Sequence, residues 1–107
     1  MLSSLFQGVA SMNDSMILGT IEAEKAAGRT LYTYGVDGMA DGCNAVKEGT
    51  LSATALQDAR KLAEGALELA SRTIGGEQLT GEDVIHVDAA LITADNVDDF
   101  LAIHEGK

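Results

Sequence analysis

The chain has 107 residues, 46% of them hydrophobic and 22% charged, and its formal net charge is −10 from 17 acidic and 7 basic residues. These proportions exclude a disordered tail, and no apolar run reaches the roughly 18 residues of a membrane span. The acidic balance disfavours nucleic acid and anionic membranes as direct ligands. The length predicts a single domain over residues 1–107, and the N-terminal residues lack the features of a signal peptide.

The predicted elements alternate between strands and helices along the chain. A mostly apolar run predicts a strand over Leu5–Ala10, after which Asp14 or Ser15 caps a helix that ends at Gly28. The same alternation continues with a strand over 31–36, a helix over 40–47, a strand over 51–56, a helix from Asp58 to about Ile74, extended segments at 84–87 and 89–93, and a short helix over 96–103.

This order predicts an α/β fold with a three-layer αβα arrangement around a mostly parallel sheet. Open sheets of this kind usually carry five or more strands, and this chain begins inside one. We therefore expect the sheet to lack one βα unit at its N-terminal side.

Polar side chains follow three of the predicted strands. Asn13, Asp37 and Gln57 stand just past the first, second and third strand. Ligands of open parallel sheets bind beyond the carboxyl ends of the strands. Amides that donate and accept, together with a carboxylate that accepts from two hydroxyls, suit a neutral polyol. The alternative is that these residues only cap helices and form turns, as Asp37-Gly38 does well.

Other chemistry finds little support in the sequence. The spacing from Asp37 to Glu48 resembles a calcium loop, but Met39 occupies a ligand position and cannot bind the ion. His86 and His104 lie far apart without partners at metal spacing, so no metal site is predicted. Cys43 is predicted to be a small core residue. No nucleotide-binding or nucleophile motif occurs, so the sequence predicts no catalytic residue and no cofactor.

Several segments resemble the C-terminal lobe of the type 1 periplasmic binding proteins, the ribose and galactose group. The segment Val9–Thr20 is similar to a strand end followed by Asn-Asp, and Gly35–Gly38 is similar to a Gly-x-Asp-Gly turn. The segment Ala45–Gln57 resembles a motif that closes on Ala-Thr-x-x-Gln, and Asp95–Phe100 resembles the end of the family sequence. The resemblance covers residues 6–101, with the motifs in the family's order.

The resemblance implies a flavodoxin-like lobe that binds a small sugar or polyol for an ABC-type importer without catalysing a reaction. It places the ligand contacts of this lobe on Asn13, Asp37 and Gln57, the residues that the strand ends also indicate. It further implies a periplasmic or extracellular location and, for full-length members, the importer's membrane subunits as partners.

The chain departs from the family pattern in ways that bear on function. The resemblance leaves the family's N-terminal lobe and the first strand and helix of its C-terminal lobe unmatched, so we expect these parts to be missing. Ala40 stands where the family often has proline. A half-site cannot enclose a sugar, so we expect the isolated chain to bind weakly or not at all. The missing unit is expected to expose a sheet edge or an apolar face, which favours a homodimer or a strand-swapped oligomer.

Two alternatives to a transport role stay open at this point. The effector-binding lobe of a lac-repressor-type transcription regulator shares the fold. The segment 27–38 lacks the acidic stretch and proline usual in such regulators, which favours transport. A structural or assembly module that has lost its ligand is the other alternative.

Overall fold

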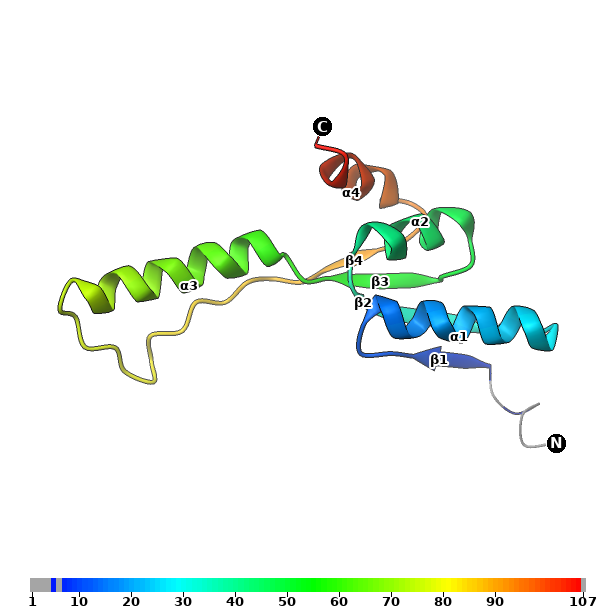
Figure 1. The fold of residues 1–107 in the computed structure, drawn as a ribbon, viewed down its shortest axis with the longest axis horizontal. Coiled ribbons are helices and arrows are strands. Elements are labelled where there is room, and N and C mark those ends of the chain that lie inside the picture. The colour runs from blue at the N-terminus through cyan, green and yellow to red at the C-terminus, as the bar shows by residue number, and fades with distance from the viewer. Residues whose placement is uncertain (1–4, 6, 107) are drawn as a thin grey trace. The chain divides into compact units, whose positions relative to one another are not determined.

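The computed structural model describes residues 5 and 7–106, which form two compact units. The sheet unit comprises residues 5–57 and 90–106, and the helical unit comprises Asp58–Ala89. The elements are β1 (Gly8–Ala10), α1 (Asp14–Ala27), β2 (Tyr32–Asp37), α2 (Ala40–Glu48), β3 (Ala53–Leu56), α3 (Ala59–Ile74), β4 (Ala90–Ile92) and α4 (Val97–His104), as Figure 1 shows. None of the helices within the described residues is long and apolar enough to cross a membrane.

The sheet has the strand order β1-β2-β3-β4. The pairs β1–β2 and β2–β3 are parallel, as predicted, whereas β4 runs antiparallel to β3. Leu56 at the end of β3 pairs with Ala90 at the start of β4, so the chain leaves and rejoins the sheet at the same edge. The α/β class with a mostly parallel sheet is thus confirmed.

Element boundaries differ from the predicted ones by a few residues. The predicted strand over Leu5–Ala10 includes Phe6, which lies outside the described residues, and β1 covers its last part. Residues 84–87 belong to no strand in the structure, although they were predicted to be extended. Their apolar character instead serves packing, because Ile85 lies against Gly65 of α3.

One face of the sheet packs against the helices of the same unit. Side chains that alternate along the strands, among them Thr33, Thr54 and Ile92, are almost fully buried on this face. The core residues come from α1, α2, α4, β4 and the α2–β3 connection: Ile17, Ile21, Cys43, Ala45, Val46, Leu51, Ile92 and Val97. Cys43 is therefore a core residue, as the sequence predicted.

The opposite face of the sheet carries no helix among the described residues of this unit. Tyr32 and Tyr34 of β2 alternate with buried neighbours and are 65% and 45% exposed, and Leu91 of β4 is 63% exposed. In the sheet unit, the described residues therefore supply two of the three predicted layers. The exposed Tyr32, Tyr34 and Leu91 give this face the apolar character that we expected from the sequence.

The helical unit consists of α3 and a segment that returns along it. Asp58 caps α3 by accepting a hydrogen bond from the Lys61 N–H at 3.1 Å, and the helix ends before Gly75-Gly76, as predicted. Gly65 is the buried residue of α3, whereas Leu67 is 70% and Ile74 87% exposed. Packing within this unit therefore covers little of the apolar surface of the helix.

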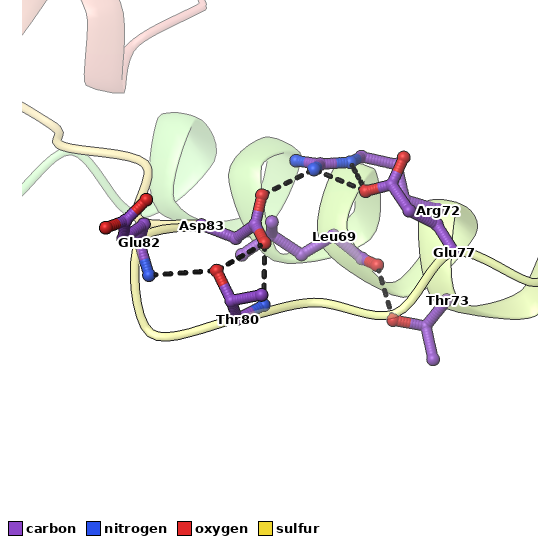
Figure 2. Close-up of polar contacts among 7 residues, drawn as sticks. All are labelled: Leu69, Arg72, Thr73, Glu77, Thr80, Glu82 and Asp83. Carbon is purple, nitrogen blue, oxygen red and sulfur yellow. Dashed lines mark hydrogen bonds and ion pairs between the residues drawn. The ribbon is translucent and has the colours of Figure 1, made fainter.

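Ion pairs hold the returning segment to the end of α3 (Figure 2). The Arg72 guanidinium contacts Glu77 and lies 2.6 Å from an oxygen of Asp83. The other Asp83 oxygen accepts from the Thr80 N–H at 2.7 Å. The Thr80 N–H and then Arg72 lower the pKa of Asp83, and Glu77 and Asp83 raise the pKa of Arg72. A protonated Asp83 would lose these bonds. They therefore persist when the pH is above the ordinary pKa of an aspartate, and they weaken only in acid.

Two glycines make room for the buried carboxyl group of Asp14, which is 1% exposed. A Cβ atom on Gly42 would lie 2.2 Å from an Asp14 oxygen, and one on Gly35 would lie 2.3 Å from the other oxygen. A glycine inside a strand usually weakens it, but Gly35 in β2 is required by packing against Asp14 of α1.

We predict that Gly42→Ala lowers the free energy of unfolding by about 1–3 kcal/mol, because the new methyl group overpacks a site where Asp14 is fixed by hydrogen bonds. Gly19→Ala is the matched control, since a Cβ on this helical glycine meets nothing within 4 Å. It should stabilise the chain by about 0.5–1 kcal/mol. Urea unfolding of both variants checks this, and equal effects would contradict the packing argument.

Candidate ligand-binding site at the strand ends

The structure places the three predicted ligand residues after neighbouring parallel strands. Asn13 follows β1 by three residues, Asp37 is the last residue of β2, and Gln57 directly follows β3. Their strands are adjacent in the order β1-β2-β3, so all three residues belong to the carboxyl edge of the sheet. The Gln57 N–H donates to the Asp37 carbonyl at 3.0 Å, which joins two of the three by a direct backbone contact.

Asn13 has a structural role in the described fold in addition to its predicted role in ligand binding. Its extended backbone precedes α1, and its Oδ1 accepts from the Met16 N–H at 2.8 Å. Asn13 is therefore the N-cap, and the prediction of a cap at Asp14 or Ser15 was wrong because both residues already lie within the helix. The cap uses one polar atom of Asn13 and leaves the donor end of its amide without a partner among the described residues.

Asp37 stands in a strained backbone conformation. Its φ of 119° lies in the region that favours glycine, and among the described residues no other non-glycine residue has a positive φ. The turn predicted at Asp37-Gly38 continues with a φ of 70° at Gly38. Asp37 is half-buried, and no described residue hydrogen-bonds or pairs with its carboxylate.

Gln57 is exposed, and its side-chain amide has no partner among the described residues. The carboxyl edge therefore offers a carboxylate acceptor at Asp37, an amide donor and acceptor at Gln57, and an amide donor at Asn13. Protein hydrogen bonds that would otherwise occupy these groups are absent from this part of the structure. Such a set can bind hydroxyl groups, which both donate and accept.

Two buried residues behind this edge were not predicted. One Asp14 oxygen accepts from the Thr54 hydroxyl at 2.6 Å, and the other accepts from the Met39 N–H at 2.9 Å. The Thr54 oxygen in turn accepts from the Gly38 N–H at 3.3 Å. The sequence prediction treated Asp14 as a cap, and the glycines at 35 and 42 were the available signal for a buried group between them.

The remaining candidate groups are Cys43 and the two histidines, His86 and His104. Burial, and then the charge of Asp14, raises the pKa of the Cys43 thiol, so this cysteine is a poor nucleophile at neutral pH. His104 lies in the sheet unit and contacts the Gly38 carbonyl at 2.8 Å, whereas His86 belongs to the helical unit. The described residues contain no group of three His, Cys, Asp or Glu side chains able to hold a metal.

A shallow hollow in the helical unit is a separate feature. It lies between α3 and residues 85–88 and is lined by charged side chains of both signs, including Lys61 and Glu64. None of the three predicted ligand residues lines it. The hollow therefore gives no support to the predicted site and does not compete with it chemically.

Comparison with known proteins identifies the family. The family profile described as "Periplasmic binding protein domain" matches residues 2–78, which is more than half of the chain. The chain therefore belongs to the periplasmic binding protein family, as the resemblance of its motifs predicted.

Individual relatives agree with this assignment. The chain is 41% identical over 92 residues to a xylitol-binding protein of Mycolicibacterium smegmatis, covering 85% of the chain and 26% of the relative. It is 34% identical over 87 residues to the ribose import binding protein of Haemophilus influenzae, covering 81% of the chain and 29% of the relative. The chain thus spans less than a third of the length of both relatives.

Solved structures confirm the fold. An ABC transporter solute binding protein from Bacillus halodurans, with bound myo-inositol, superposes with a TM-score of 0.76 at 31% identity. The match covers 90% of this chain and 33% of that protein. The described elements are therefore those of one part of a larger solute-binding fold.

We predict that Asn13→Ala lowers the free energy of unfolding by about 1 kcal/mol, because α1 loses its cap. Asn13→Asp should change it by only a few tenths of a kcal/mol, since a carboxylate oxygen accepts the same Met16 N–H. Asn44→Ala, on the exposed face of α2, is the control and should cause no loss. Chemical unfolding measures all three, and an unchanged Asn13→Ala variant would refute the cap.

Proposed function

We propose that this chain binds a small sugar or polyol at the carboxyl edge of its sheet, as the non-catalytic part of a solute receptor for an ABC-type importer. The observation that carries the proposal is the set of uncommitted polar groups on Asn13, Asp37 and Gln57. The family and the relatives named for xylitol and ribose support the ligand class. They also support a periplasmic or extracellular location and the importer's membrane subunits as partners.

The hydrogen-bond donors and acceptors at this edge favour a neutral ligand over an ionic one. The edge presents one carboxylate and two amides, so an anionic ligand would meet Asp37 without a cation to offset it. A polyol satisfies both kinds of group because each hydroxyl donates to a carboxylate or carbonyl and accepts from an amide. Binding without turnover is supported by the relatives, which are named as binding proteins.

The length of the chain, compared with that of its relatives, bears on how strongly it binds a ligand. The relatives are three to four times as long as the matched segment, so in them this edge is one part of the protein. Three polar residues on one open edge leave much of a bound sugar in water. We therefore propose weak binding by this chain alone and full affinity only where a second surface closes over the ligand.

We predict that the melting temperature of the chain rises with at least one of D-ribose, D-galactose, xylitol and myo-inositol at high concentration. A ligand at a hundred times its Kd stabilises a protein by about 2.7 kcal/mol. Asp37→Asn should abolish the rise, because it replaces the acceptor pair while asparagine tolerates a positive φ.

The same variant is the control for general stabilisation by polyols, which raises the melting temperature of any protein through exclusion from its surface. Only the difference between the wild-type chain and Asp37→Asn reports the site. Equal shifts for the two proteins with every polyol would contradict the proposed site.

We also propose that a second copy of the chain covers the bare face of the sheet. This face presents Tyr32, Tyr34 and Leu91, and the outer backbone edge of β1 has no strand beside it among the described residues. An apolar face and an open strand edge are the features through which chains pair or exchange strands.

We predict that light scattering shows a mass above that of the monomer, rising with protein concentration. Tyr34→Lys should return the chain to a monomer, because it places a charge in the centre of the face. Leu67→Lys introduces the same charge on an exposed residue of the helical unit and should leave the mass unchanged. A wild-type monomer at all concentrations would refute the self-association.

A further inference from the structure

The turn that carries Asp37 is held through its backbone by other elements. The Gly38 N–H donates to the Thr54 hydroxyl of β3 at 3.3 Å, and the Met39 N–H donates to the Asp14 carboxylate of α1 at 2.9 Å. The Gly38 carbonyl lies 2.8 Å from Nε2 of His104 in α4. Consecutive backbone groups of the turn are therefore fixed by three different elements.

Asp14 and Thr54 form the buried centre of this arrangement. Each is 1% exposed, and the Thr54 hydroxyl donates to Asp14 at 2.6 Å. The hydroxyl accepts from Gly38 on its other side, so one chain of hydrogen bonds runs from the turn through β3 to α1. Buried polar groups satisfied in this way fix geometry, because breaking one bond leaves its partners without water.

The strained backbone of Asp37 is the conformation that this hydrogen-bond network stabilises. A φ of 119° is unfavourable for a residue with a Cβ atom and persists only when the surroundings fix it. The turn is fixed on one side by the Gln57 N–H to the Asp37 carbonyl and on the other by the bonds to Gly38 and Met39.

We propose that Asp14 and Thr54 are positioning residues that keep the Asp37 turn in its strained conformation and thereby align the Asp37 carboxylate with Gln57 for the polyol. The alignment with a ligand rests on the function proposed above, whereas the effect on the turn does not. Asp14 also follows Asn13 in the chain, so the same carboxylate fixes the first turn of α1 next to the third ligand residue.

The test compares Thr54→Val with Thr33→Val in the isotope-labelled chain. Thr33 is the matched control because it is fully buried on the same face, and its hydroxyl donates to the Thr50 carbonyl at 3.1 Å, away from the turn. The first readout is the three-bond coupling between the amide and α protons of Asp37. This coupling is small at the observed φ and becomes large when the residue relaxes to an extended conformation.

We expect Thr54→Val to raise the Asp37 coupling, Thr33→Val to leave it unchanged, and Thr54→Ser to restore it, although both valine variants lose stability. The second readout is the Kd for the polyol that shifts the wild-type chain, which Thr54→Val should weaken about tenfold relative to Thr33→Val. If Thr54→Val does not fold, Asp14→Asn serves in its place, because it keeps the side-chain shape and replaces one acceptor oxygen with a donor.

An Asp37 coupling unchanged in Thr54→Val, or raised equally in Thr33→Val, would overturn the positioning role. If the wild-type chain binds none of the four polyols, the proposed binding by this chain fails, and the coupling alone then decides whether Asp14 and Thr54 hold the turn. The two failures are therefore distinguishable.

Discussion

The buried carboxylate of Asp14 joins three elements of the sheet unit, and the geometry of the carboxyl edge depends on these bonds. It lies at the start of α1 and accepts from Thr54 in β3 and from the backbone that follows β2. A carboxylate without solvent requires such partners, because an unpaired buried charge strongly destabilises a protein. The close approach of Gly35 and Gly42 makes the position possible, since a side chain on either would meet the carboxylate.

In this arrangement, the polar residues of the edge fall into two classes, those bonded to protein and those with unpaired functional groups. Asp14 and Thr54 are buried and bonded to protein, whereas the functional groups of Asp37 and Gln57 stand at the same edge without a partner among the described residues. Asn13 belongs to both classes, because one end of its amide caps α1 and the other end is uncommitted. A binding surface for hydroxyl groups needs this combination of a fixed framework and unpaired polar groups at its surface.

Much of this could be predicted from the sequence, and the exceptions have physical reasons. Alternating strand and helix patterns predicted the α/β class, and Gly28 and Asp58 marked helix ends correctly because capping is a local property. The antiparallel direction of β4 could not be read from three apolar residues, since strand patterning is the same for both directions. Asp14 was misassigned because a cap and a buried carboxylate share the same local sequence, and contacts with residues 39 and 54 decide between them. The strand ends brought Asn13, Asp37 and Gln57 to one edge, and their role in binding stays a prediction.

One bound polyol is proposed to contact Asn13, Asp37 and Gln57 together, and side-chain NMR signals report such contacts residue by residue. The amide groups of Asn13 and Gln57 give resolved proton–nitrogen signals, which can be followed while xylitol, D-ribose or myo-inositol is added to the labelled chain. We expect both signals to shift along one common saturation curve and Asp37→Asn to remove both shifts together. Shifts confined to one amide, or shifts that persist in Asp37→Asn, would contradict a shared site.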